Sequence, residues 1–130
     1  MLDISDKQFD ELISQALDEL PQQFVERLNN VAIVYQDEPN ADQQQKLALR
    51  CDQLLLGLYE GIPLTKRGAG YNLVLPDKIT IFKKPILAMS ADIAALKRQI
   101  KHTLWHEIAH FFGLDHDRIH EIEKRWKVSQ

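Results

Sequence analysis

The chain contains one cysteine, Cys51, and this scarcity excludes the disulfide-stapled domains of secreted proteins. A lone thiol cannot form an intrachain disulfide, and no base is evident beside it, so we interpret it as a small core residue. The first residues lack the basic and apolar regions of a secretory signal. No apolar run approaches the ~18 residues that a membrane span requires. We therefore expect a cytoplasmic protein with no membrane contact.

An excess of positive charge is missing as well. The formal net charge is −3 and the sequence pI is about 5.9, so no overall basic field attracts the chain to nucleic acid or to an anionic membrane. The glycine-rich segment at 66–70 lacks the residue order of a phosphate-binding loop. With 130 residues, of which 45% are hydrophobic, the chain can form one domain, 1–130, with its own core.

Apolar periodicity predicts an α+β fold that begins with a helix. Ser5 and Gln8 have the spacing of a capping box, and the apolar stripe that follows continues to Leu20. The last long periodic segment predicts a helix over 92–112. Between these two helices the sequence predicts short helices at 22–28 and 41–50 and strands at 31–35, 54–59, 73–75 and 78–82. The predicted sheet is small and mixed, and Lys83-Lys84-Pro85 marks a break or an edge.

The last predicted helix carries the sequence His-Glu-Ile-Ala-His-Phe-Phe-Gly-Leu-Asp-His, from His106 to His116. Residues four apart on a helix project from one face, so His106 and His110 can each offer a ring nitrogen to one metal ion. Glu107 lies one step around the helix, where a carboxylate can act as general base on a water at the metal. Gly113 permits the positive φ that ends a helix, and His116 can return as the third ligand. Three protein ligands leave one position open, which is typical of a catalytic zinc site.

This helix also separates its apolar side from the side that carries the motif. At ~100° per residue, one arc is apolar and is predicted to face the core: Ile93, Leu96, Ile100, Leu104, Ile108 and Phe111. A neighbouring arc holds Gln99, Thr103, His106 and His110. The two motif histidines are therefore predicted to project beside the core into a cleft. Trp105 and Phe112 lie outside both arcs, and we expect them to pack against another element, such as the C-terminal segment.

All five histidines of the chain lie between His102 and His120, a concentration that chance composition does not readily produce. His102 lies one helical turn before His106, and His120 follows His116 by four residues. We interpret His102 and His120 as solvated helix residues and not as ligands.

The sequence His-Glu-x-x-His-x-x-Gly-x-x-His resembles the motif of the zincin metallopeptidases, and its context is similar to the small bacterial minimal-zincin family. The segments Gly57–Leu64 and Thr103–Asp115 carry this resemblance. It implies a compact zincin-like single domain with a C-terminal active-site helix and with Zn2+ on His106, His110 and His116. It implies Glu107 as the base in peptide hydrolysis. By the same resemblance, the region 78–82 pairs with an extended peptide or protein substrate.

The chain departs from the larger zincins in one respect. Those proteins have a methionine turn beneath the metal, downstream of the third ligand. Here both methionines, Met1 and Met89, precede the motif. We name Trp126 as the candidate residue that packs under the histidines instead, with a plain core or surface tryptophan as the alternative.

Two other functions are compatible with the sequence. A small bacterial rRNA-maturation family of metal-dependent endoribonucleases has three histidines at this spacing, and Gly113–His116 resembles part of its motif. That family has glycine where this chain has Glu107, and the glutamate favours peptide hydrolysis. A basic patch near the cleft would favour the ribonuclease alternative, and its candidate members are Lys66, Arg67, Lys83 and Lys84. The third possibility is a non-catalytic zinc-binding interaction protein. The sequence determines neither the substrate nor the oligomeric state.

Overall fold

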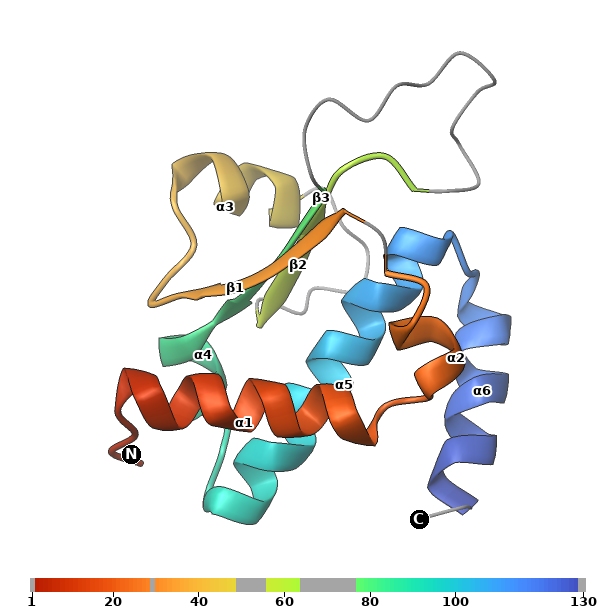
Figure 1. The fold of residues 1–130 in the computed structure, drawn as a ribbon. Helices are drawn as coiled ribbons and strands as arrows, with labels where there is room; N and C mark the ends of the chain where they lie inside the picture. The colour runs from red at the N-terminus through yellow and green to blue at the C-terminus, as the bar shows by residue number, and fades with distance from the viewer. Residues whose placement is uncertain (1, 29, 49–55, 64–76, 129–130) are drawn as a thin grey trace.

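The computed structural model describes residues 2–28, 30–48, 56–63 and 77–128, with no side chain described at 47 or at 126–128. Figure 1 shows the order of the elements along the chain. The fold is α+β, as the sequence predicts. In chain order the elements are α1 (Asp6–Glu19), α2 (Gln22–Val25), β1 (Val31–Gln36), α3 (Ala41–Ala48), β2 (Gly57–Glu60), β3 (Asp77–Phe82), α4 (Lys83–Ala88), α5 (Ile93–Phe112) and α6 (His116–Val128).

The three described strands form one mixed sheet in the order β1-β3-β2. β1 runs parallel to β3, with Ile33 opposite Ile79, and β2 runs antiparallel to β3, with Tyr59 opposite Ile79. This arrangement corrects the expectation that the strand at 78–82 lies at the cleft edge. β3 is the central strand, and the backbone groups on both of its sides are used by its two neighbours. Among the described strands, β2 is the edge strand next to α5.

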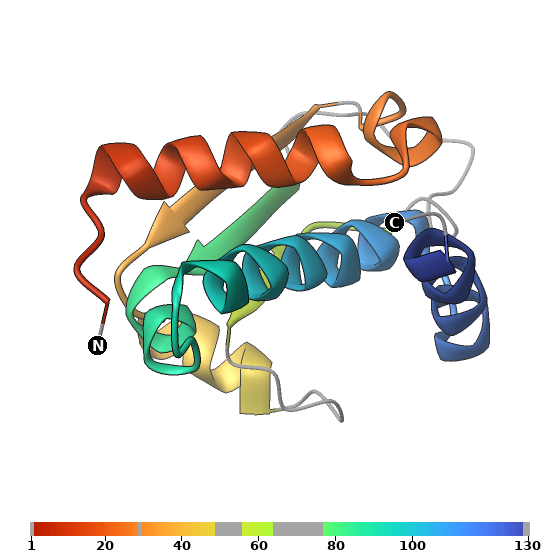
Figure 2. The same ribbon diagram turned by 90° about the horizontal axis from the view of Figure 1, so that it is seen from below.

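Helices α1 and α5 cover one face of the sheet, and both lie in front of the strands in Figure 2. Ile79 and Ile81 of β3 belong to the same buried cluster as Phe9 of α1 and as Leu104 and Ile108 of α5. Alternate residues of a strand point to opposite faces, so β3 buries its two isoleucines on the helix side. The burial of this cluster holds α5 in place against the sheet.

The N-terminal helix begins as predicted. The Ser5 hydroxyl accepts a hydrogen bond from the Gln8 backbone N–H at 3.1 Å, and the Gln8 side chain accepts from the Ser5 N–H at 2.9 Å. These two bonds form a capping box, which satisfies backbone donors that have no partner inside the helix. The cap therefore determines where α1 starts, and the apolar stripe then determines which side faces α5.

Helix α3 lies on the opposite side of the sheet. Its fully buried Gln43 exchanges hydrogen bonds of 3.0 Å with Gln36 of β1 and donates to Glu60 of β2 at 3.3 Å. Lys46 and Lys78 form ion pairs with Glu60. Partial burial raises the pKa of Glu60, but the hydrogen bonds from Lys46 and Gln43 and the positive charges of Lys46 and Lys78 together outweigh it, so the pKa is lowered. Glu60 thus links α3 to the end of the edge strand.

Two helices were missed by the sequence prediction. The break expected at 83–85 is the start of α4, which Pro85 tolerates because the first turn of a helix needs few N–H donors. The helix expected to be the last is followed by α6, whose start is capped by Asp115 accepting from the Arg118 N–H at 2.8 Å. The strand expected at 73–75, and parts of the segments 41–50 and 54–59, lie outside the described residues.

The aromatic residues outside the two arcs of α5 pack against α2, and Trp105 also belongs to the same buried cluster as Ile119 and Ile122 of α6. Phe24 contacts the rings of both Trp105 and Phe112 edge to face, each at a centroid distance of 5.3 Å. The apolar arc is largely confirmed, since its predicted core residues are buried with the exception of Ile93. In the described part of the chain, no helix is long and apolar enough to cross a membrane.

Candidate metal centre

The motif lies in the last two turns of α5. Asp92 caps the start of this helix by accepting from the Ala95 N–H at 2.8 Å, and Gly113 ends it with φ of 70°. Residues with a side chain rarely adopt this left-handed conformation, so glycine is the favoured residue here. The Gly113 and Leu114 N–H groups donate to the carbonyls of His110 and Ala109, each at 3.0 Å. These two hydrogen bonds and the left-handed Gly113 therefore end α5 at a defined residue, and the chain turns at once into α6.

His106 and His110 face one another as the spacing predicts. Their Nε2 atoms lie 3.1 Å apart, and their rings meet edge to face at 4.7 Å between centroids. His106 is buried and His110 is half-buried. Two nitrogens in a tetrahedral zinc site lie about 3.3 Å apart when each Zn–N bond is about 2.0–2.1 Å. The observed separation fits a shared metal ion, because two imidazole nitrogens at this distance need a proton or a cation between them.

Glu107 completes a cluster of three potential ligand groups. One ligand atom from each of His106, Glu107 and His110 lies within 4.8 Å of the others. Glu107 is only 1% exposed. Its Oε1 accepts a hydrogen bond of 2.9 Å from the backbone N–H of Tyr59 in β2. The edge strand of the sheet therefore holds the carboxylate beside the two histidines.

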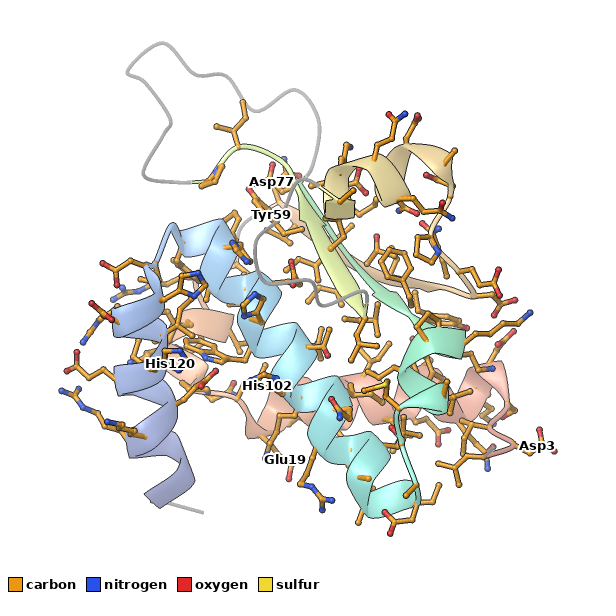
Figure 3. All side chains as sticks on the ribbon, turned by 180° about the vertical axis from the view of Figure 1, so that it is seen from behind. Asp3, Glu19, Tyr59, Asp77, His102 and His120 are labelled. Carbon is orange, nitrogen blue, oxygen red and sulfur yellow. The ribbon has the colours of Figure 1, made fainter. Side chains whose placement is uncertain are left out.

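Tyr59 is itself fixed by two contacts. Its hydroxyl donates to Oδ2 of the buried Asp77 at 2.7 Å, and its ring meets Phe111 edge to face at 6.0 Å. Figure 3 labels Tyr59 and Asp77 at the same end of the sheet. A short hydrogen bond to a buried carboxylate is among the stronger neutral-to-charged contacts. Asp77 in β3 therefore holds the Tyr59 side chain, and the Tyr59 backbone N–H in β2 holds the Glu107 carboxylate. Sequence reasoning missed this role of Tyr59, because its contact to Glu107 is made by a main-chain group that every residue except proline has.

The short distance between β2 and α5 depends on Gly57. A Cβ atom at this position would lie 2.6 Å from Cγ2 of Thr103, which is far inside van der Waals contact. Thr103 precedes Glu107 by one helical turn on α5. The missing side chain of Gly57 therefore allows α5 to approach β2 closely enough for the Tyr59 N–H to reach Glu107.

The structure does not bring the fourth motif residue into the cluster. His116 is the first residue of α6, it is exposed, and it does not belong to the group of ligand atoms within 4.8 Å. It follows Gly113 and the short turn at Leu114 and Asp115, so it lies near the end of α5 that carries His110. Its role as third ligand stays a prediction.

The two histidines interpreted as solvated share one partner. The buried Glu123 of α6 lies between His102 of α5 and His120 of α6. Its Oε1 is 3.5 Å from Nε2 of His102, and its Oε2 is 3.6 Å from Nδ1 of His120. Both histidines are substantially exposed, as predicted, but each contacts the carboxylate of a buried glutamate that the sequence analysis did not single out.

Two further sequence predictions concern residues outside or beside the centre. The side chain of Trp126 lies outside the described residues, so its proposed role beneath the histidines stays a prediction. Lys66 and Arg67 of the predicted basic patch also lie outside the described residues. Lys83 is described: its ammonium is buried at the end of β3 and pairs with Asp6 of α1 at 2.8 Å. Lys83 is thus engaged with α1 and is not part of an exposed basic patch.

The arrangement can hold a divalent metal ion and supply a carboxylate beside it. Imidazole nitrogens are the usual protein ligands of zinc, and a buried carboxylate next to them is a suitable proton acceptor. No curated protein matches the chain significantly in sequence. A family model described as zincin-like metallopeptidase matches residues 28–126, from three residues before β1 to two residues before the end of α6. The chain therefore belongs to the zincin-like metallopeptidase family.

Proposed function

We propose that this protein is a zinc-dependent peptidase that uses Glu107 as general base. The observation that carries the proposal is the position of Glu107: a buried carboxylate within 4.8 Å of two facing histidine nitrogens, held by the edge strand. A metal site alone would be compatible with several activities. Family membership and the glutamate together favour the hydrolysis of peptide bonds.

His106 and His110 would hold the metal, with His116 as the proposed third ligand. A zinc ion there supplies a water activated at neutral pH and polarises the scissile carbonyl. Glu107 accepts the proton that the attacking water loses and delivers it to the leaving amine. The Tyr59 N–H binds Oε1 of Glu107, which orients the carboxylate for that transfer. Burial around Glu107 keeps bulk water from competing for the proton.

We further propose that the substrate is an extended peptide or protein segment that lies along β2. The central position of β3 leaves it no room for a further strand, whereas β2 is an edge strand among those described. Because Tyr59 of β2 contacts Glu107, a peptide along this strand would pass beside the general base. A cytoplasmic location, which the lone cysteine favours, belongs to the same proposal.

The test compares the purified protein with the Glu107→Gln variant. We expect both to bind one zinc per chain by elemental analysis, because glutamine is isosteric and the two facing histidines remain. Loss of the base should lower peptide turnover by about 10²–10⁴-fold. Removal of zinc with a chelator should abolish turnover in the wild type, and added zinc should restore it.

A peptide library and an RNA substrate assayed in parallel separate the two candidate reactions. Cleavage of peptides, but not RNA, by the wild type alone supports the proposal. Full peptidase activity in Glu107→Gln would remove Glu107 from the mechanism. Cleavage of RNA that is independent of Glu107 would assign the chain to the other class.

A further inference from the structure

We infer that Glu123 is a positioning residue, which docks α6 onto α5 and thereby determines where His116 lies relative to His106 and His110. This inference rests on the proposed function, because it assumes that His116 binds the metal. Glu123 is a buried carboxylate on a helix that is otherwise rich in exposed charge. A buried charge is costly unless other groups compensate it, so its location calls for a physical reason.

The contacts of Glu123 supply that reason. Its two carboxylate oxygens reach different helices, Oε1 toward His102 of α5 at 3.5 Å and Oε2 toward His120 of α6 at 3.6 Å. Figure 3 labels these two histidines on α5 and α6. The contact of Oε1 with His102 bridges the two helices, whereas the contact of Oε2 with His120 stays within α6. A contact that spans two elements restrains their relative position, which a pair within one helix cannot do.

Few other side chains attach α6 to the domain in the described part of the chain. Ile119 and Ile122 are buried in the main core cluster, and they lie on the same side of the helix as Glu123. The other charged contacts on this helix stay on its surface: Glu121 pairs with Arg118 and Arg125, all well exposed. The two isoleucines supply apolar burial, which is non-directional. Glu123 adds a contact with a defined partner on α5.

Helical geometry connects this contact to His116. His116 and Glu123 are seven residues apart, which is about two turns or ~10.5 Å along α6, and they lie within about 20° of one another around its axis. On α5, His102 and His110 are eight residues apart, or ~12 Å along the axis and about 80° around it. α6 turns back past the C-terminal half of α5 after the short turn at Gly113 (Figure 1). The short turn keeps His116 near the end of α5 that carries His110, and the contact of Glu123 with His102 determines the direction in which α6 leaves that turn.

His116 is exposed and outside the cluster, so its approach to the other two ligands depends on how α6 is held. A ligand that is already near its binding position loses less conformational freedom when the metal binds. Without the Glu123 contact, α6 would have more freedom around the turn, and His116 would bind at a greater entropic cost. The consequence is a lower zinc affinity with no change in the other two ligands.

The experiment is a double-mutant cycle on zinc affinity with the full chain at one pH. The four proteins are wild type, Glu123→Gln, His116→Ala and the double variant, each titrated with zinc against a competing chelator. We expect Glu123→Gln to weaken zinc binding on the order of tenfold, in the range found for residues that support metal ligands. In the His116→Ala background the same substitution should change the affinity by less than about twofold. His102→Ala, at an exposed residue, should reproduce the effect of Glu123→Gln from the α5 side. Glu121→Gln, on the surface of the same helix, is the control and should leave the affinity unchanged.

The possible outcomes separate this inference from the proposed function. If wild type binds no zinc, the proposed function fails. If His116→Ala weakens binding but Glu123→Gln does not, the proposed function stands and the positioning role is wrong. An equal loss in both backgrounds would also overturn it, because Glu123 would then act through general stability. A second zinc equivalent in the wild type that disappears in Glu123→Gln would make Glu123 a metal ligand and would equally overturn the inference.

Discussion

Replacing Gly57 with alanine introduces one methyl group at the contact between the edge strand β2 and helix α5, which carries the candidate metal centre. The new Cβ would lie 2.6 Å from Cγ2 of Thr103, 3.2 Å from the carbonyl oxygen of Thr80 and 3.4 Å from Cδ1 of Ile81. Only the first distance is inside hard contact. Thr103 is buried on α5, a helix held by the core, so its methyl group cannot simply turn away into solvent.

The expected loss of stability follows from two opposing effects. Overpacking a well-packed contact by one methyl group costs about 1–3 kcal/mol. Alanine also restricts the unfolded chain, which contributes about 0.4–1 kcal/mol in favour of folding where the backbone is compatible. Gly57 is not among the described residues with positive φ, so its backbone is compatible with alanine. We therefore expect Gly57→Ala to lower the free energy of unfolding by about 0.5–2.5 kcal/mol.

Thr103→Ser provides the matched partner, because it removes the methyl group that the new Cβ would strike and keeps the hydroxyl. Alone, it should cost about 1 kcal/mol for the loss of one buried methyl group. In that background, Gly57→Ala should cost clearly less, since the remaining neighbours at 3.2 Å and 3.4 Å need to shift by only a few tenths of an ångström. The coupling between the two substitutions should therefore be about 1–3 kcal/mol.

The assay is urea unfolding of the four proteins of this cycle, followed by the fluorescence of the buried Trp105. Peptidase activity provides a second measurement, because a shift of α5 away from β2 would lengthen the hydrogen bond between the Tyr59 N–H and Glu107. Gly57→Ala should lower the activity, and Thr103→Ser should restore part of it. Equal losses from Gly57→Ala with threonine and with serine at position 103 would refute the idea that this contact limits the distance between strand and helix.

Two further predictions concern the groups around the site. Tyr59→Phe removes the hydroxyl that binds the buried Asp77, so the free energy of unfolding measured in urea should fall by about 1–3 kcal/mol. The zinc affinity of this variant should stay within about twofold of the wild type, because the backbone N–H at 59 remains. A large loss of zinc binding in this variant would contradict the assignment of the support to the main chain. The pKa of Glu60 is lowered below its usual 4.5, so its contribution to stability is present above 4.5 and is lost as the pH falls through the folded-state value. The difference in unfolding free energy between wild type and Glu60→Gln should therefore shrink on acidification, and a difference independent of pH would show that the ionised form is not the stabilising one.

Much of the fold could be predicted because it depends on local patterns. The capping box at Ser5 and Gln8 and the left-handed stop at Gly113 depend on a few neighbouring residues, and both are confirmed. The strands β1 and β3 follow from short β-branched and aromatic runs. The order of the strands could not be predicted, because pairing joins segments that are distant in the sequence. That is why β3 was expected at the edge and is found in the centre.

The candidate site also has one part that follows from local spacing and another that depends on contacts between distant segments. The facing nitrogens of His106 and His110 follow from a spacing of four residues on one helix, which helical geometry alone brings together. The hydrogen bond from the Tyr59 backbone N–H to Glu107 joins sheet and helix between residues 48 positions apart, and no pattern of side chains predicts it. The interpretation of His102 and His120 was correct about their exposure but missed Glu123, because α6 was not predicted and its position against α5 was therefore unknown.

By itself, the sequence determined the two long helices α1 and α5, the spacing of the two facing histidines and the glutamate beside them, because each arises within a few residues of helix. Only the tertiary structure decided which strand borders the active-site helix, which backbone group holds Glu107, and how α6 lies against α5. These features depend on packing between segments that the chain brings together from distant positions. In this protein a spacing of four residues creates the pair of facing histidines, and the packing of β2 and α6 on α5 determines what surrounds it.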